Sequence, residues 1–346
     1  MRLLVTGGAG FIGSAFVRRR LGAAGDAIVV LDKLTYAGNR ANLDEAERRP
    51  ELAQRYEFVR GDIIDAPTVE GLVAGCDAVV NFAAESHVDR SILDPSAFMR
   101  TNVLGVHVLL EATRRATDAG HPVRFVQVST DEVYGSRDEG FSDEEDRLAP
   151  RSPYAAAKAA GELLVNAYRV TYDIDVVTTR GSNTYGPYQH PEKMVPLFIT
   201  SALDDQALPL YGDGLQRRDW LYVDDHADAV GFVLERGVAG ETYNIAGGEE
   251  RTNREVTAAI LELLAKPWSL VRRVEDRPGH DRRYAMDGSK LAALGWAPRV
   301  DLAQGLRRTV DWFRVHEPWW RAIKGGEWRA YYDLQYGERL ARSVEA

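Results

Sequence analysis

The sequence predicts an α/β protein with a doubly wound parallel sheet and a smaller C-terminal α/β domain. Short apolar segments alternate with helix-length segments through the first half of the chain. This alternation is typical of right-handed βαβ units, whose helices cover both faces of a parallel sheet. Strand segments such as residues 125–128 are largely apolar on both faces, as a covered sheet requires. After residue 186, turns rich in proline and glycine separate shorter elements, which indicates a second domain.

The large sheet accounts for six predicted strands, at residues 3–6, 27–31, 57–60, 78–82, 124–129 and 176–180. Helices are predicted at residues 11–21, 101–117 and 153–172. We assign residues 1–185 to the first domain and 186–346 to the second, and the strand-like segments near 220–245 can return to the first. The aromatic-rich tail at 312–336 is interpreted as a packed C-terminal helix, with a surface for stacking a nucleotide base as the alternative.

Length and charge narrow the class of protein. A chain of 346 residues predicts about two domains at roughly 150 residues each. Its net charge is -9, from 43 Lys and Arg against 52 Asp and Glu. Nucleic-acid affinity comes from neutralised phosphates, so we expect no nucleic-acid partner. A small anionic ligand held by a local basic cluster is compatible with this charge.

Cysteine and hydropathy patterns set further expectations. Cys76 is the only cysteine, which excludes a disulfide scaffold and a cysteine-ligated zinc site, and we expect no metal site. No apolar run reaches the roughly 18 residues of a membrane-spanning helix. The chain starts with a strand pattern and not with a signal-peptide pattern. We therefore expect a cytoplasmic protein with no membrane partner.

A glycine-rich segment joins the first strand to the first helix, and it reads Gly7-Gly8-Ala9-Gly10-Phe11-Ile12-Gly13. Glycines at these positions allow a tight turn, a close approach to a pyrophosphate and packing of the helix on the sheet. The helix N-terminus adds unpaired N–H groups and a positive dipole end. In this strand-to-helix context the motif predicts a Rossmann-type dinucleotide site, with a simple glycine turn as the alternative.

The second strand ends at Asp32, about 20 residues after the last glycine, where a carboxylate can accept hydrogen bonds from the adenine ribose. The same carboxylate repels a 2′-phosphate, which favours NAD over NADP as the cofactor. Asp62, after the third strand, is either a contact to the adenine edge or a helix cap.

Tyr154 and Lys158 lie four residues apart in a predicted helix that Ser152 can cap and Pro153 can begin. They therefore share one helix face. A cation near a phenol lowers the phenol pKa, and a phenolate is a general base for a sugar hydroxyl. The alternative is an exposed pair without a catalytic role.

The strand before this helix runs into Ser129-Thr130-Asp131-Glu132. Ligands bind beyond the carboxyl ends of strands in open α/β sheets. Two adjacent carboxylates at this place suit one acid and one base whose pKa values differ because of their surroundings. An Asp-Glu pair that caps a solvated loop is the alternative interpretation.

With these motifs the sequence resembles the dTDP-glucose 4,6-dehydratases of the extended short-chain dehydrogenase/reductase superfamily. The resemblance covers roughly residues 1 to 320. Its broad motifs are the glycine loop and the Tyr154/Lys158 pair. Its narrow motifs are Thr-Asp-Glu at 130–132 and Ala-Ala-Glu-Ser-His-Val-Asp-Arg-Ser at 83–91. Further matching segments lie at residues 31–39, 130–135, 185–193, 218–220 and 277–281.

The resemblance implies a redox-neutral dehydration of dTDP-glucose with tightly bound NAD. It implies that Tyr154 takes the C4 hydroxyl proton with help from Thr130 and Lys158, while the hydride goes to NAD. Glu132 would then remove the C5 proton, and Asp131 would protonate the departing C6 hydroxyl. Return of the hydride to C6 gives dTDP-4-keto-6-deoxyglucose, an intermediate of deoxysugar biosynthesis.

The resemblance and the motifs together give two sets of binding residues. The expected NAD contacts are Gly7, Gly10, Phe11, Ile12, Gly13, Asp32, Lys33, Thr35, Asp62, Ile63, Ala83, Ser86, Thr101, Tyr154 and Lys158. The implied substrate contacts are His87, Thr130, Asn183, Glu192, Lys193, Arg218, Asn253, Arg277, His280 and Tyr284. Five arginines between residues 268 and 283 agree with this assignment, because a guanidinium fork suits a diphosphate.

The chain departs from the family pattern at three positions. Thr184 stands where a second Asn is usual, Gly181 where a Cys or another residue is common, and Ala157 where a Ser is frequent. None of these changes removes a proposed catalytic group.

Two other functions are compatible with parts of the pattern. A nucleotide-sugar epimerase or decarboxylase keeps the Tyr and Lys but lacks the adjacent Asp-Glu, and a non-catalytic NAD sensor typically loses Tyr or Lys. The choice between thymidine and uridine rests on the resemblance alone, and the pathway that uses the product stays open. The family also implies a homodimer through the helices at 101–117 and 153–172, whose apolar spacing would equally serve an internal core.

Overall fold

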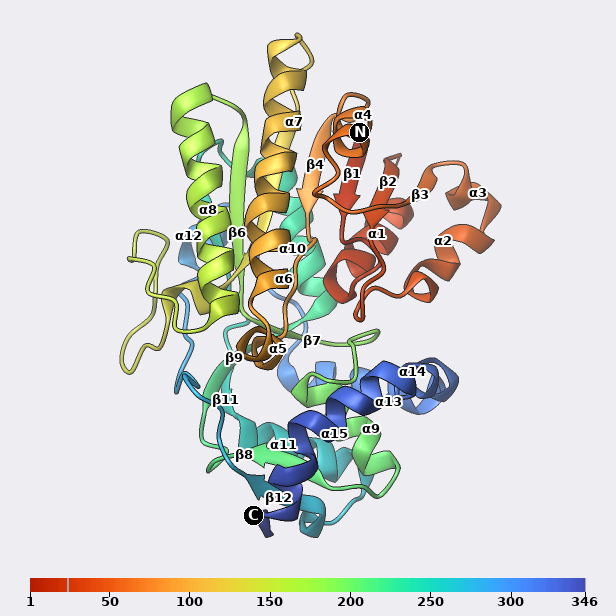
Figure 1. Cartoon of the computed structure of the whole chain (residues 1–346), viewed down its shortest axis with the longest axis vertical. Coiled ribbons are helices and arrows are strands. Elements are labelled where there is room, and N and C mark those ends of the chain that lie inside the picture. Colours follow the sequence, from red (N-terminus) through yellow and green to blue (C-terminus); the bar gives the residue numbers. More distant parts are fainter. Residues whose placement is uncertain (24, 346) are drawn as a thin grey trace.

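The computed structural model describes residues 1–23 and 25–345. Its largest element is a seven-stranded sheet with the order β10-β6-β5-β4-β1-β2-β3, in which every neighbouring pair is parallel (Figure 1). The strands are β1 (Arg2–Thr6), β2 (Ala27–Asp32), β3 (Tyr56–Arg60), β4 (Ala78–Asn81), β5 (Arg124–Thr130), β6 (Val176–Gly181) and β10 (Thr242–Ile245). The predicted Rossmann-type α/β class is confirmed.

Helices cover both faces of this sheet. One face carries α1 (Phe11–Ala23) and α10 (Val223–Arg236), and the other carries α4 (Ala66–Val73), α7 (Val106–Asp118) and α8 (Pro153–Tyr172). Side chains alternate along a strand, so Leu3 and Val5 pack with the first pair of helices and Leu4 with the second group. All three residues are fully buried. The strands are apolar on both faces because each face meets helices.

Helix α8 begins and ends where the sequence predicts. The Ser152 side chain accepts a hydrogen bond from the Ala155 N–H at 3.1 Å, and Pro153 occupies the first turn. The helix predicted at 101–117 is instead divided into a π-helical turn, η2 (Arg100–Gly105), and α7. In that turn the Asn102 side chain exchanges two hydrogen bonds of 3.0 Å with the backbone of Glu85. The irregular turn therefore fixes the loop that follows β4.

The C-terminal part contains two three-stranded sheets, with the orders β11-β9-β7 and β13-β12-β8. Their strands are β7 (Asn183–Tyr185), β8 (Leu208–Tyr211), β9 (Arg217–Tyr222), β11 (Glu250–Thr252), β12 (Val271–Val274) and β13 (Val344–Glu345). Their helices are α9 (Met194–Leu203), α11 (Asn253–Leu264), α13 (Leu302–Val315), α14 (Glu317–Ile323) and α15 (Gly326–Ala341). The remaining short elements are η1 (Arg40–Leu43), α2 (Asp44–Arg48), α3 (Pro50–Ala53), α5 (Val88–Leu93), α6 (Ser96–Met99), η3 (Asp131–Tyr134), η4 (Trp268–Leu270) and α12 (Ser289–Ala293).

The two later strand segments divide between the sheets. Strand β10 returns to the large sheet and pairs with β6, whereas β9 pairs with β7 and β11 in a small sheet. Asp219 explains the second placement, because its carboxylate accepts hydrogen bonds from the N–H groups of Gly247 at 2.7 Å and Glu249 at 2.9 Å. These bonds hold β9 next to the loop that leads into β11. The domain division near residue 186 remains a prediction.

The aromatic tail forms α13, α14 and α15, which pack on the C-terminal core. Trp320 and Trp328 are buried there among apolar side chains. Figure 1 shows these helices below the large sheet, with α15 running toward the C-terminus. In the described ranges no helix has both the length and the apolar character that a bilayer crossing needs.

Candidate active site

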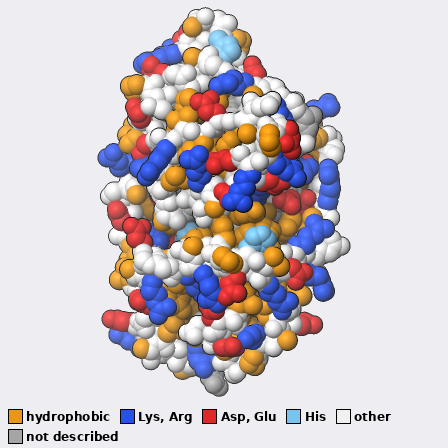
Figure 2. All heavy atoms as spheres, turned by 90° about the vertical axis from the view of Figure 1, so that its right-hand side faces the viewer, with side chains coloured by type: hydrophobic (Ala, Val, Ile, Leu, Met, Phe, Trp, Pro, Cys, Tyr) orange, Lys and Arg blue, Asp and Glu red, His pale blue; other side chains and the backbone are white. Residues whose placement is uncertain are grey.

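A continuous cleft of about 1760 Å³, counted with its open mouth, lies along the carboxyl ends of the large-sheet strands. Its wall includes all fifteen residues expected to bind NAD and the five expected to be catalytic. It also includes four of the residues expected to bind substrate, which are Asn183, Glu192, Lys193 and the catalytic candidate Thr130. Figure 2 shows one side of the molecule, where basic and acidic side chains are interspersed and hydrophobic side chains gather with a histidine near mid-height.

The glycine loop makes close backbone contacts at positions where a side chain would not fit. Gly7 has a φ of +69°, and an added Cβ there would lie 2.5 Å from the Ala83 N. At Gly13 an added Cβ would lie 2.3 Å from the carbonyl oxygen of Gly7. Helix α1 begins directly after Gly10, so its free N–H groups face the cleft end of β1. This cradle fits the pyrophosphate of a dinucleotide.

Asp32 is buried at the end of β2, and backbone N–H groups hold its carboxylate. Oδ2 accepts from Ala9 at 2.9 Å and Oδ1 accepts from Leu34 at 2.8 Å. Burial raises the pKa of Asp32, and these two hydrogen bonds counteract the rise. Each carboxylate oxygen retains a second acceptor site, which suits ribose hydroxyls.

Asp62 does not cap a helix. The N-cap of α4 is Asp65, whereas Asp62 Oδ1 accepts from the Ile64 N–H at 3.2 Å and Oδ2 pairs with Lys33 Nζ at 2.6 Å. The ion pair brings together two residues that the sequence assigned to the cofactor.

Tyr154 and Lys158 lie on the buried side of α8, so the alternative of an exposed pair is excluded. The Lys158 ammonium donates to the Val128 carbonyl at 2.6 Å, and burial lowers the pKa of Lys158 to about 8. The pKa of Tyr154 is raised, first by burial and then by the charge of Glu132, while a hydrogen bond with Thr130 lowers it. The expected lowering of the phenol pKa is therefore absent in this structure, because burial outweighs the hydrogen bond.

Asp131 and Glu132 are adjacent but have different surroundings. Asp131 accepts a hydrogen bond from Thr130 Oγ1 at 3.1 Å, and its Oδ2 is buried without a partner. Burial and the charge of Glu132 raise the pKa of Asp131 well above its ordinary value. Burial also raises the pKa of Glu132, but the positive charges of Arg277, Lys193 and Arg218 oppose that rise. The pKa of both carboxyls is therefore raised, well above the ordinary value at Asp131, while cations face Glu132.

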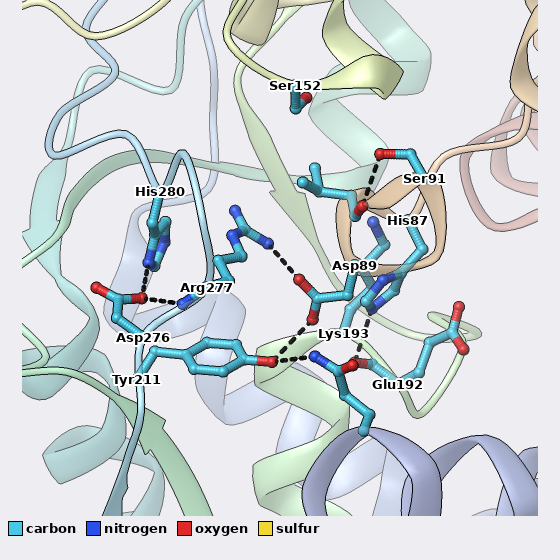
Figure 3. A network of polar contacts seen from close by, with 12 residues as sticks. His87, Asp89, Ser91, Ser152, Glu192, Lys193, Tyr211, Asp276, Arg277 and His280 are labelled. Carbon is cyan, nitrogen blue, oxygen red and sulfur yellow. Dashed lines mark hydrogen bonds and ion pairs between the residues drawn. The ribbon is translucent and has the colours of Figure 1, made fainter. Parts of the chain in front are cut away.

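Several predicted substrate residues surround Glu132 from the C-terminal part. The Tyr284 hydroxyl lies 3.5 Å from Glu132 Oε2 and donates to Asp281 at 2.6 Å. The Arg218 guanidinium lies 4.2 Å from the centre of the Tyr284 ring. Figure 3 shows Arg277 pointing toward Asp89, with His87 and Lys193 beside them. These groups form a basic wall opposite the carboxylates of Asp131 and Glu132, which follow β5 in η3.

Other predicted residues occupy positions behind or beside this wall. His87 is buried, with Nε2 3.3 Å from the Glu192 carbonyl oxygen. The Lys193 ammonium donates to the Ser86 carbonyl at 2.8 Å, and His280 Nδ1 lies 2.6 Å from Asp276 Oδ1. Asn253 begins α11 and donates its backbone N–H to Gln216, next to the strand that carries Arg218.

Sequence reasoning missed His226, which lines the cleft from α10. Its ring occupies the space over Gly181, where an added Cβ would lie 2.3 Å from His226 Cε1. His226 Nδ1 lies 2.7 Å from Thr184 Oγ1, and Nε2 is buried without a partner. Two departures from the family pattern, Gly181 and Thr184, therefore meet at this ring. A histidine inside a helix gave no signal that could have indicated this.

The site contains the parts for proton transfer. In residues 1–23 and 25–345, no three His, Cys, Asp or Glu side chains are grouped as metal ligands. The arrangement combines a dinucleotide cradle, a phenol, two unlike carboxyls and a basic wall. It can support hydride transfer next to acid and base catalysis.

Comparisons with known proteins agree with this chemistry. The sequence profile of the GDP-mannose 4,6 dehydratase family matches residues 4–309. A dTDP-glucose 4,6-dehydratase of Streptomyces niveus is 53% identical over 332 residues, which is 94% of this chain and 96% of that protein. The dTDP-glucose 4,6-dehydratase 1 of Escherichia coli is 46% identical, and the match covers 98% of this chain and 100% of that protein.

Solved structures of a dehydratase and of an epimerase share this fold. A dTDP-glucose 4,6-dehydratase of Streptomyces venezuelae, with NAD and a dTDP ligand bound, is 52% identical with a TM-score of 0.90, covering 94% of this chain and 100% of that one. A UDP-glucose 4-epimerase of Thermus thermophilus in complex with NAD has a TM-score of 0.82 at 35% identity, covering 91% of this chain and 100% of that one.

Proposed function

The chain belongs to the dTDP-glucose 4,6-dehydratases of the extended short-chain dehydrogenase/reductase superfamily, and on that basis we propose that it converts dTDP-glucose to dTDP-4-keto-6-deoxyglucose. It is an NAD-dependent lyase of deoxysugar biosynthesis. The observation that carries this function is the pair Asp131 and Glu132 next to Tyr154, since elimination needs an acid and a base beyond those of a simple dehydrogenase.

The cofactor is held by the glycine loop and the ends of β1, β2 and β4. The Gly7 cradle and the buried Asp32 carboxylate fit the pyrophosphate and a ribose. NAD bound there would supply a hydride acceptor for C4 of the sugar and, once reduced, a hydride donor for C6. Because each turnover regenerates it, the cofactor stays on the protein through the cycle.

We assign the first proton transfer to Tyr154. Its hydroxyl hydrogen-bonds with Thr130, and both groups line the cleft. A positive nicotinamide and the Lys158 ammonium favour the phenolate, which opposes the effect of burial on the phenol. Tyr154 then takes the C4 hydroxyl proton while the hydride leaves C4, and the product of this step is a 4-ketone.

We assign the elimination to Glu132 and Asp131. The 4-ketone acidifies the C5 proton, and Glu132 removes it because three cations favour its ionised form. Asp131 keeps its proton and transfers it to the C6 hydroxyl, which leaves as water. The hydride returns to C6 and a proton returns to C5. No net oxidation occurs, and the atoms balance as loss of one water.

The remaining polar residues bind the nucleotide sugar. Guanidinium groups suit a diphosphate, which assigns Arg218 and Arg277 to that group. A carboxylate repels a diphosphate, so Glu192 is assigned to sugar hydroxyls. Lys193, His87, Asn183, Asn253, His280 and Tyr284 complete the proposed substrate set.

An epimerase is the second candidate, since a UDP-glucose 4-epimerase shares the fold. Epimerisation returns the hydride to C4 and needs no acid for C6. The Asp131 carboxyl favours the dehydratase, because it lines the cleft and its raised pKa favours the protonated form that an acid for C6 needs.

The test uses dTDP-glucose carrying deuterium at C4, with the purified protein and its own cofactor. We expect deuterium at C6 of the product and solvent hydrogen at C5. Loss of the C4 deuterium to solvent would contradict direct transfer, and a dTDP-galactose product would identify an epimerase. Parallel initial rates with UDP-glucose determine whether thymidine is the preferred base.

We also propose a cytoplasmic homodimer. Leu163 and Val170 are 62% and 78% exposed on α8, and Leu104 and Tyr172 add to the apolar surface of the same layer. Figure 1 shows α7 and α8 side by side over this face of the sheet. Residues seven apart share a helix face, so a second copy can cover Leu163 and Val170. The Leu163→Lys variant should elute as a monomer in size-exclusion chromatography with light scattering, and an unchanged mass would reject this interface.

The lone, buried Cys76 agrees with a reducing compartment.

A further inference from the structure

Two consecutive residues of α5, Asp89 and Arg90, contact proposed substrate residues of the C-terminal part. The mechanism above uses neither of them. Asp89 is 3% exposed, and the Arg90 guanidinium is half-buried between aromatic rings. We infer that Asp89 and Arg90 are positioning residues that hold Arg277 for the diphosphate and Glu192 for the sugar. The inference rests on the proposed function and names how its substrate site is assembled.

Asp89 joins three elements that are distant in the sequence. Its Oδ1 accepts from Arg277 Nη1 at 3.2 Å, and its Oδ2 accepts from the Tyr211 hydroxyl at 2.9 Å (Figure 3). Gln335 of α15 donates to the same Tyr211 hydroxyl at 2.6 Å. Both oxygens of Asp89 are therefore occupied by groups from the C-terminal part, and its carboxylate has one orientation.

Arg277 depends on this carboxylate for its own orientation. Its side chain is 17% exposed, and its Nε is buried without a partner. The Asp276 carboxylate fixes the backbone of the loop, because it accepts from the Arg277 N–H at 2.8 Å and contacts His280. The guanidinium donates to the Asp89 carboxylate, which leaves its remaining N–H groups for an anion. A bidentate guanidinium needs such an anchored geometry to select a diphosphate.

Arg90 makes the corresponding contact with Glu192. Its Nη2 and Nε donate to Glu192 Oε2 at 2.8 and 3.1 Å, and Nε also lies 3.3 Å from Oε1. The guanidinium lies 3.9 Å from the ring centre of Tyr36 and 4.0 Å from that of Tyr331. Tyr36 lies in the segment after β2, next to the expected NAD contact Thr35, and Tyr331 lies in α15. Arg90 thus fixes Glu192 relative to both parts of the molecule.

The two positioned residues are assigned to different parts of the substrate, and this difference makes the inference testable. Arg277 is assigned to the diphosphate, so loss of the Asp89 charge should weaken the binding of both dTDP and dTDP-glucose. Glu192 is assigned to the sugar, so loss of the Arg90 guanidinium should weaken the binding of dTDP-glucose and leave that of dTDP unchanged. If the two residues had a purely structural role, their loss would not affect the binding of one ligand more than that of the other.

The experiment compares Asp89→Asn, Arg90→Gln and the conservative Arg90→Lys with the wild type as NAD-loaded enzymes. We measure KM and kcat for dTDP-glucose, the Kd of dTDP by calorimetry, bound NAD and thermal unfolding. Asp89→Asn should raise both KM and the dTDP Kd by about tenfold, the scale of a lost charged hydrogen bond. Arg90→Gln should raise KM by about tenfold and leave the dTDP Kd within about twofold, while Arg90→Lys recovers part of KM because it retains the charge.

Asp228→Asn is the matched control. Asp228 likewise accepts from an aromatic side chain, the indole N–H of Trp296 at 3.1 Å, and pairs with Arg19 and with Arg299, but none of these partners is a proposed substrate residue. Its loss should lower stability and leave KM and the dTDP Kd unchanged. If Asp89→Asn does not fold, Tyr211→Phe removes only the hydroxyl that donates to Asp89 and should raise the dTDP Kd severalfold.

The outcomes distinguish this inference from the proposed function. Folded Asp89 and Arg90 variants with wild-type KM and Kd would overturn the inference, and so would a lower KM in Asp89→Asn, which would mean that Asp89 competes with the diphosphate. A wild-type protein that binds dTDP but does not convert dTDP-glucose would overturn the proposed function. In that case the dTDP Kd of Asp89→Asn still tests the positioning of Arg277.

Discussion

The Lys158 ammonium donates a hydrogen bond to the carbonyl oxygen of Val128, 2.6 Å away, within the lining of the cleft. The expected partner of this cation was the Tyr154 phenol, one helical turn earlier. Because the ammonium is anchored on a strand carbonyl, the phenol pKa is determined mainly by burial. The cofactor's positive charge must therefore contribute to the formation of a phenolate.

Tyr154→Phe should suppress the first oxidation. The variant keeps the ring and loses the hydroxyl that takes the C4 proton. We expect the rate of C4 oxidation to fall by about a hundredfold or more, the scale of a lost general base. Single-turnover absorbance of the reduced nicotinamide measures this step, and a wild-type rate would reject the role.

Glu132→Gln should stop the reaction after oxidation. The amide cannot take the C5 proton, whereas the steps at C4 need only Tyr154 and the cofactor. We expect reduced nicotinamide to accumulate on the protein after dTDP-glucose is added, with little product. Asp131→Asn, the adjacent control, should also block water loss while exchange of the C5 proton with solvent continues. Unimpaired turnover by Glu132→Gln would show that another group is the base.

Lys158→Met should remove activity and raise stability near pH 7. Burial lowers the pKa of Lys158 to about 8, below the ordinary value of 10.5, so the charged form is disfavoured in the folded state. Below pH 8 both states carry the charge and the penalty is complete. Between pH 8 and 10.5 the wild type should gain stability, because only the unfolded chain keeps the proton. Urea unfolding at pH 7 should show a gain on the order of 1–3 kcal/mol for the variant, and a loss there would contradict the buried-charge explanation.

Acid should destabilise the protein between pH 6.5 and 4. Burial lowers the pKa values of His190 and His226 to about 4 from an ordinary value of 6.5. In that interval the unfolded chain binds protons that the folded chain does not, so this stability is complete above pH 6.5 and is lost as the pH falls toward 4. His226→Gln should unfold with a weaker pH dependence, measured by urea titrations.

Gly7→Ala should empty the cofactor site. The methyl group would lie 2.5 Å from backbone at Ala83, in a left-handed conformation that alanine disfavours. We expect the purified variant to carry far less NAD than the wild type, by absorbance of the denatured extract. Gly22→Ala, where an added Cβ meets no atom within 4 Å, should retain NAD. Full NAD content in Gly7→Ala would contradict the cradle.

Local patterns predicted the large sheet and α8, because strand alternation and helix caps act over a few residues. The cofactor side of the cleft followed from the same signals, since β1, its glycine loop and β2 are consecutive. Asp89 and Arg90 lie in a visible motif, but the side chains that hydrogen-bond with them lie between 102 and 188 residues away. No local pattern encodes such contacts. The placement of β9 in a small sheet depends similarly on hydrogen bonds that Asp219 accepts from the N–H groups of a later loop.

The contact between Gly181 and the His226 ring restricts how this enzyme can evolve. A side chain at position 181 requires the ring to leave its place and to give up the contact with Thr184. Substitutions at the two positions are therefore not independent, and their order matters. A lineage that first shortens residue 226 can later enlarge residue 181, whereas the reverse order passes through a damaged intermediate. Directed-evolution libraries that randomise both positions together should recover combinations that stepwise mutagenesis misses.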